Sequence, residues 1–149
     1  MQNNKFIKGS IVIFVLALLG FLDATYLTIE HFMNRIPPCT LTSGCETVLT
    51  SSYSAIFGIP VALLGSIYYL SLLIALFVYF DFKNQKILRY VCRFSLAGFL
   101  FSLYFVAIQI FVLHSYCLYC LISATLSILI FVTSMSLDHC MNIKNENKL

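Results

Sequence analysis

Two cysteines separated by two residues, Cys117 and Cys120, stand at the start of a long apolar run. Residues three apart lie on the same face of a helix, close enough to form a disulfide. At a helix start, a thiol also feels the positive end of the helix dipole, which favours the reactive thiolate. The spacing indicates a redox-active pair, and the rest of the chain must supply its electron donor and its electron acceptor.

The composition places this pair in a membrane protein. Of the 149 residues, 10% are charged and 60% are apolar, against roughly 25% and 45–50% in soluble domains. Crossing a hydrocarbon core as a helix takes about 20 apolar residues. Four such spans are predicted, at about 10–29, 59–80, 90–113 and 117–137. We therefore expect a single all-α membrane domain over residues 1–149, a bundle of four transmembrane helices.

The longest polar connection, residues 30–58, precedes the second span. Within it, apolar residues recur at roughly helical spacing between serines and threonines from Cys45 to Phe57. This pattern predicts a short amphipathic helix on the membrane surface. Pro60 is well placed as a first-turn residue of the next helix.

The basic residues predict the orientation of the spans. Of the nine Lys and Arg residues, only Arg35 lies in the 30–58 loop, and the tight turn 114–116 has none. The others lie in the two tails and around the turn between the second and third spans. The positive-inside rule then puts both termini in the cytoplasm, and the 30–58 loop and the 114–116 turn on the outer side.

The six cysteines divide by compartment. Cys92 and Cys140 are expected at the cytoplasmic ends of spans, as buried thiols that behave like small apolar residues. The other four are expected on the outer side, where disulfides persist: Cys39, Cys45, Cys117 and Cys120.

Three interpretations of the outer cysteines remain open. They form structural disulfides, a four-sulfur zinc site, or a relay of exchanging dithiols. The relay is favoured, because a Cys-x-x-Cys loop is too short to restrict the unfolded chain much and the spacing from Cys39 to Cys45 is loose for zinc. A relay at the head of a membrane helix has a natural acceptor in a quinone, which takes up two electrons and two protons.

The sequence resembles the vitamin K epoxide reductase family in its bacterial disulfide-forming branch. The resemblance covers nearly the whole chain, and the loop cysteines precede the Cys-x-x-Cys motif, the reverse of the order in DsbB-like proteins. The matching segments are Phe21–Thr28, Cys39 with Cys45, Ser51–Ser54, Ile56–Pro60 and Cys117–Ala124.

The resemblance implies a path for the electrons. Cys39 would exchange with a thioredoxin-fold, DsbA-like protein outside the bacterial cytoplasmic membrane. Cys45 would attack Cys117 of the Cys117–Cys120 disulfide, and Cys120 would face a quinone, either ubiquinone or menaquinone. Some relatives carry a fused thioredoxin-like domain; this sequence stops at Leu149, so the partner is expected to be a separate protein.

The resemblance also implies a quinone pocket capped by the loop helix. Asp23 is the one acid inside a span, and such residues are functional candidates by default, although an interfacial role is an alternative. Gln109, an amide inside the third span, is expected to link helices. The predicted quinone-contacting residues are Cys120, Ser51, Ser54, Asp23, Tyr26, Ser123 and Phe57.

Two alternative functions remain at this stage. The same cysteines can serve a quinone-epoxide reductase, with vitamin K epoxide as the example, because that reaction requires only that the Cys-x-x-Cys pair start reduced. A protein of another class, a non-catalytic membrane scaffold with structural disulfides, also fits the outer cysteines.

Overall fold

The computed structural model describes residues 2–35 and 44–146, which form helices and one small hairpin. Four helices, each containing an apolar stretch long enough to cross a membrane, confirm the predicted four-helix architecture. A short helix in the connection between the first two is confirmed as well. The elements are α1 (Gln2–Phe32), α2 (Cys45–Leu49), β1 (Ala55–Ile56), β2 (Ile59–Pro60), α3 (Val61–Phe82), α4 (Gln85–Phe111) and α5 (Leu118–Glu146).

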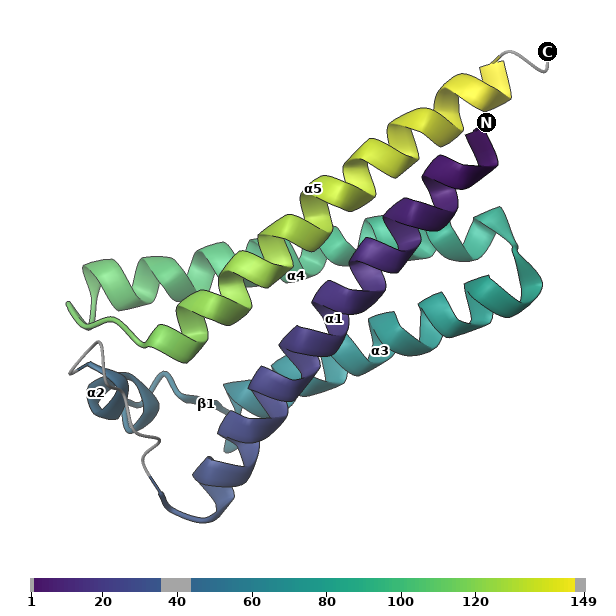
Figure 1. The fold of residues 1–149 in the computed structure, drawn as a ribbon. Coiled ribbons are helices and arrows are strands. Elements are labelled where there is room, and N and C mark those ends of the chain that lie inside the picture. Colours follow the sequence, from purple (N-terminus) through teal and green to yellow (C-terminus); the bar gives the residue numbers. More distant parts are fainter. Residues whose placement is uncertain (1, 36–43, 147–149) are drawn as a thin grey trace.

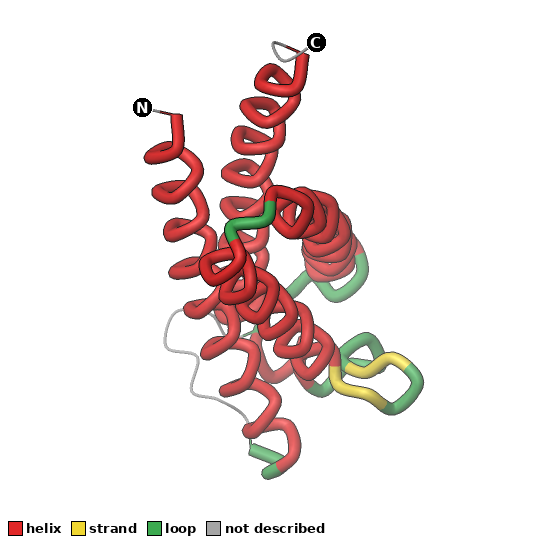
Figure 2. The backbone as a smooth tube through the Cα atoms, turned by 90° about the vertical axis from the view of Figure 1, so that its right-hand side faces the viewer, coloured by secondary structure: helices red, strands yellow, loops and turns green. Residues whose placement is uncertain are grey.

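The four long helices form an antiparallel bundle. Helix α1 packs against α3 and α5, and α4 packs against α5, while the contact between α3 and α4 is smaller. Both termini lie at one end of the bundle (Figures 1 and 2). Helix α2, the hairpin and the α4–α5 turn lie at the opposite end, which we call the cysteine end because it holds Cys45, Cys117 and Cys120 (Figure 1).

The apolar core fills the half of the bundle away from the cysteine end. Its fully buried side chains include Ile13 of α1, Leu72 and Leu76 of α3, and Ile130 of α5. Tyr69, also fully buried, lies at the boundary between this core and the cysteine end. Packing in this half holds the helices in position relative to one another. The half at the cysteine end can therefore contain a cavity.

The approach of α1 to α3 depends on Gly20. A methyl group at this position would overlap the ring of Tyr69, which is 2% exposed. We expect Gly20→Ala to lower the free energy of unfolding by about 1–3 kcal/mol, because a tightly packed ring must move. Thermal unfolding in detergent measures this. Gly65→Ala is the matched control, since its Cβ would meet the nearest atom at an ordinary 3.6 Å, and equal unfolding temperatures for the two variants would contradict the prediction.

Helix α4 begins at Gln85, earlier than the predicted start of the third span near residue 90. Lys83 ends α3 in the left-handed conformation, with φ of 48°. The Asn84 side chain then accepts a hydrogen bond from the backbone N–H of Lys86 at 3.0 Å and caps α4. The polar turn therefore shrinks to two residues, because a side-chain cap lets the helix extend into polar sequence.

The loop helix is shorter than the predicted Cys45–Phe57, since α2 ends at Leu49. The hydroxyls that follow bond back to carbonyls: Ser51 Oγ donates to Val48 O at 2.7 Å, and Ser54 Oγ donates to Ser51 O at 2.8 Å. Such local bonds compete with helix continuation. Strands β1 and β2 then pair as a hairpin, with Phe57 and Gly58 at its tip in left-handed conformations of φ 52° and 79°.

Candidate redox site

The Cys-x-x-Cys motif forms the entry to α5. The Cys117 carbonyl accepts the first helical hydrogen bond, from Leu121 N–H at 3.0 Å. Cys117 Sγ accepts from the backbone N–H of Cys120 at 3.4 Å, in the position that a Ser or Asp oxygen takes in a helix cap. The two Sγ atoms lie 2.8 Å apart, and both residues are free thiols. The backbone thus holds the two sulfurs in the geometry for disulfide exchange.

This environment favours the thiolate of Cys117, which lies one residue before the spanning part of α5. The S–H of Cys120, donated to Cys117 Sγ, lowers the pKa of the Cys117 thiol, and burial opposes it. Backbone N–H groups of Cys120 and Tyr119 lower this pKa further, and the net direction is downward. A thiol with a lowered pKa is both a better nucleophile at neutral pH and a better leaving group.

Gln109 stabilises the α4–α5 turn that precedes the Cys-x-x-Cys motif. Its side-chain Oε1 accepts the backbone N–H of Cys117 at 3.2 Å, and its backbone carbonyl accepts from Ser115 N–H at 3.2 Å. Gln109 is 3% exposed. His114, which comes directly before Ser115 in this turn, takes a left-handed conformation with φ of 46°. The buried amide therefore links α4 directly to the residue that carries the first sulfur.

Removing this amide is expected to weaken the site. Gln109→Met keeps an unbranched side chain but leaves the buried N–H of Cys117 unpaired, at a cost of about 1–3 kcal/mol. We expect a lower unfolding temperature in detergent and a slower oxidation of the Cys117–Cys120 pair, measured by alkylation of the remaining thiols. Ile110→Met, on the exposed face of the same helix, is the control. A Gln109→Met protein with both properties unchanged would show that this bond has no role.

Cys45 lies next to Cys117 in the fold. Both are buried, at 1% and 0% exposed, in one small apolar cluster with Val48. Gly44 permits this approach, because a Cβ there would meet the Tyr116 backbone at 2.7 Å. Cys45 is disulfide-bonded. Cys39 lies outside the described residues, so its predicted exchange with an external partner stays a prediction.

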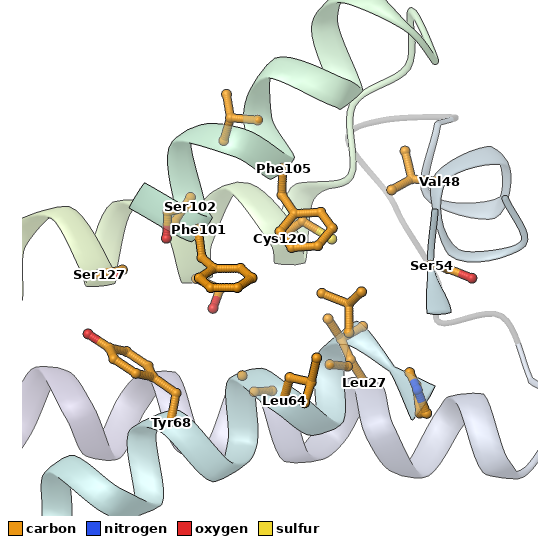
Figure 3. A pocket seen from close by; sticks show the side chains of 18 of the residues that line it. Leu27, Val48, Ser54, Leu64, Tyr68, Phe101, Ser102, Phe105, Cys120 and Ser127 are labelled. Atoms are coloured by element: carbon orange, nitrogen blue, oxygen red, sulfur yellow. The ribbon is translucent and has the colours of Figure 1, made fainter. Parts of the chain in front are cut away.

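A cavity of about 390 Å³ opens beneath α2 at the cysteine end. Its walls are mostly apolar, and α1, α3, α4 and α5 all contribute. Phe101, Phe105 and Cys120 face Leu27 and Leu64 across it (Figure 3). The second sulfur of the motif thus lines a partly open apolar cavity, whereas Cys117 is fully buried beside Cys45 and Val48.

Five of the seven predicted quinone-contacting residues line this cavity: Cys120, Asp23, Ser51, Ser54 and Ser123. The hydroxyls of Ser51 and Ser54 are bonded to local carbonyls, and Ser123 Oγ lies 3.1 Å from Tyr69 Oη. Asp23 differs, because its Oδ2 is buried without a hydrogen-bond partner among the described residues.

The other two predicted residues, Tyr26 and Phe57, do not lie in the cavity wall. Phe57 is fully exposed at the hairpin tip, because the chain turns there instead of continuing α2. Tyr26 is on the outer face of α1 and packs against the ring of Tyr119, with centroids 5.6 Å apart. Neither side chain lines this cavity, and a quinone contact for either one stays a prediction.

Cys92 lies apart from the site. Cys92 is buried in the core, and its thiol donates to the Ser134 carbonyl at 3.2 Å, as expected for a packing residue. The side chain of Cys140 is outside the description. Within residues 2–35 and 44–146, no group of three or more His, Cys, Asp or Glu side chains is placed to hold a metal ion.

Some residues at the site had no predicted site role, among them Gln109, Tyr68 and Ser127. Gln109 was expected only to link helices, and the presence of an amide within a membrane span was the available signal. Tyr68 and Ser127 also line the cavity. Their types are common in membrane helices, so nothing in the sequence separated them from packing residues.

These features define a class of protein. A dithiol at the start of a membrane helix, packed against a disulfide-bonded cysteine, can take up and release an electron pair, which is the chemistry of membrane thiol oxidoreductases. The model of the Vitamin K epoxide reductase family matches residues 11–135, and the chain belongs to this family. It is therefore an oxidoreductase of quinone-linked thiol chemistry that acts with redox partners, and the non-catalytic scaffold is set aside.

Proposed function

We propose that the protein is a membrane thiol–quinone oxidoreductase that generates disulfides in an external thioredoxin-fold protein. One observation carries the proposal: Cys117 shares a buried cluster with Cys45, while Cys120 lines the apolar cavity. The motif thus contacts a loop cysteine on one side and a space suited to a quinone ring on the other. Acceptance of two electrons and two protons is the chemistry that a bound quinone supplies.

The sulfurs pass one electron pair in balanced steps. A reduced partner dithiol exchanges with a Cys39–Cys45 disulfide, which leaves the partner oxidised and the loop pair reduced. Cys45 thiolate then attacks Cys117 Sγ of the Cys117–Cys120 disulfide and releases Cys120 as a thiolate. Cys39 attacks Cys45, re-forms the loop disulfide and releases Cys117.

After these steps the loop pair is again a disulfide, and Cys117 and Cys120 are thiols that hold the electron pair. Oxidation of this pair re-forms its S–S bond and gives up two electrons and two protons to the quinone. We assign the exchange of these protons to Asp23, because its Oδ2 is buried in the same cavity without a hydrogen-bond partner among the described residues.

The proposal includes an orientation in the bacterial cytoplasmic membrane. The chain ends and the α3–α4 turn, which carry most of the basic residues, face the cytoplasm. The cysteine end then faces the outer side, where disulfides persist and a DsbA-like partner acts. Reporter fusions at the C-terminus test this, and a C-terminus on the outer side would contradict it.

Reconstitution tests the function. The purified full chain is mixed in detergent with a reduced thioredoxin-fold protein and either ubiquinone-1 or a short-chain menaquinone, and quinone absorbance and partner thiols are followed together. We expect one quinol for each partner disulfide. Parallel incubation with vitamin K epoxide and dithiothreitol tests the alternative reaction. A protein that reduces no quinone would overturn the proposal.

A further inference from the structure

We propose that Tyr68 and Ser127 donate hydrogen bonds to the far carbonyl oxygen of a para-quinone ring whose near edge contacts Cys120. This inference rests on the proposed function and names the ring class and its orientation. It concerns the inner end of the cavity, one turn beyond the residues that the sequence singled out.

Two buried hydroxyls face each other at this inner end, and they interact with each other. Tyr68 Oη and Ser127 Oγ are both buried, and neither makes a hydrogen bond of standard geometry within the described chain. Ser127 is 2% exposed. The Tyr68 hydroxyl points from α3 toward Ser127 on α5 across the cavity (Figure 3). Buried hydroxyls nearly always complete their hydrogen bonds, so a pair without a bond of standard geometry keeps donors for a ligand oxygen.

The packing fixes the position of the Tyr68 phenol. Its ring lies against Tyr69 and Phe94, with centroids 5.1 and 5.3 Å away. Gly98 of α4 leaves room for the phenol, because a Cβ there would overlap the Tyr68 ring and hydroxyl. Tyr69, the next residue, has its hydroxyl occupied by the Ser123 carbonyl at 2.8 Å. Tyr68 is therefore the tyrosine available to a ligand.

The geometry of α5 sets the distance between Cys120 and Ser127. Ser127 follows Cys120 by seven residues, so both lie on nearly the same face of α5, about 10 Å apart along the axis. A hydrogen bond takes about 2.8 Å of this length. The remaining length, about 7 Å, corresponds to a sulfur in van der Waals contact with a six-membered ring and the carbonyl on its opposite side.

The donor pattern matches a para-quinone. A carbonyl oxygen has two lone pairs and accepts one hydrogen bond from each hydroxyl. Reduction increases the electron density on that oxygen, so both bonds strengthen as Cys117 and Cys120 are oxidised. An ortho-quinone carries both oxygens on one side of the ring, so it would not place an oxygen at each end of this cavity.

Paired hydroxyl variants test the assignment in the full-length protein with dithiothreitol and ubiquinone-1. Tyr68→Phe and Ser127→Ala are each expected to raise the KM for the quinone about 10-fold, the effect of one lost hydrogen bond to a ligand. The matched controls are Tyr104→Phe and Ser136→Ala, which alter exposed side chains outside the cavity lining. Alkylation of Cys117 and Cys120 after oxidation confirms that each variant keeps a working thiol pair.

Infrared spectroscopy supplies a readout that packing alone would not change. With ubiquinone-1 labelled by ¹³C at one or the other carbonyl, the far carbonyl stretch should be lowered in the wild-type protein and restored toward its solution frequency in Tyr68→Phe and in Ser127→Ala. Unchanged KM and unchanged carbonyl frequencies in the double variant, beside a wild-type protein that reduces the quinone, would overturn this inference alone. Absence of quinone reduction by the wild-type protein would overturn the proposed function and this inference with it.

Discussion

Cys120→Ala is expected to abolish quinone reduction, with a loss of at least about 10³-fold, as for removal of other catalytic nucleophiles. Cys120 is the sulfur that lines the cavity, and without it the pair cannot close its disulfide. The loss should be the same whether a protein partner or dithiothreitol supplies electrons, because both routes pass through this pair. Stopped-flow absorbance of ubiquinone-1 measures it.

The control for this variant is Cys92→Ser, which alters a cysteine of the apolar core and keeps a donor for the Ser134 carbonyl. Its rate should stay within about twofold of the wild-type rate. A Cys120→Ala protein that reduces quinone at the rate of Cys92→Ser would remove the motif from the electron path and refute the proposed mechanism.

The long helices were predictable because membrane insertion imposes a strong rule on sequence. A span must be apolar over about 20 residues, and nothing in the chain competes with that requirement. The same logic located the motif at the entry to a helix, where Cys117 was found as the capping residue. These features depend on local sequence and on the bilayer, so no tertiary information was needed.

The extent of the helix between α1 and α3 was predicted wrongly, because side-chain hydroxyls there compete with backbone N–H groups for the carbonyls that would continue the helix. Ser51 and Ser54 bond to nearby carbonyls and end the helix early, and the chain then turns through Phe57 and Gly58. The apolar spacing that suggested a longer helix was therefore misleading. A Phe in a left-handed conformation is rare enough that a sequence pattern gives no reason to expect it.

The cavity residues were partly predictable because helical spacing carries over from the motif. Ser123 lies one turn after Cys120 and faces the same space, as its position implied. Gln109 and Tyr68 reach the site from other helices, and their roles depend on how α3, α4 and α5 are rotated and shifted against one another. That register follows from side-chain packing, which a single sequence leaves undetermined.

Cys45→Ala is expected to separate the two halves of the reaction. Oxidation of a reduced thioredoxin-fold partner should fall at least about 10³-fold, since Cys45 supplies the sulfur that attacks Cys117. Quinone reduction driven by dithiothreitol should persist, because Cys120 is half-buried in an open cavity that a small dithiol can enter. The same variant should accumulate a mixed disulfide between Cys39 and the partner, since Cys45 is no longer present to resolve it.

Non-reducing electrophoresis of the partner mixture detects this adduct, and Cys39→Ala in the same background should remove it. Thr47→Ala, on the exposed face of α2, controls for disturbance of the loop helix and should leave both half-reactions intact. Partner oxidation at the wild-type rate by Cys45→Ala would mean that electrons enter the Cys117–Cys120 pair directly. In that case the burial of Cys45 beside Cys117 would be structural, and the loop cysteines would be a staple for α2 instead of a relay.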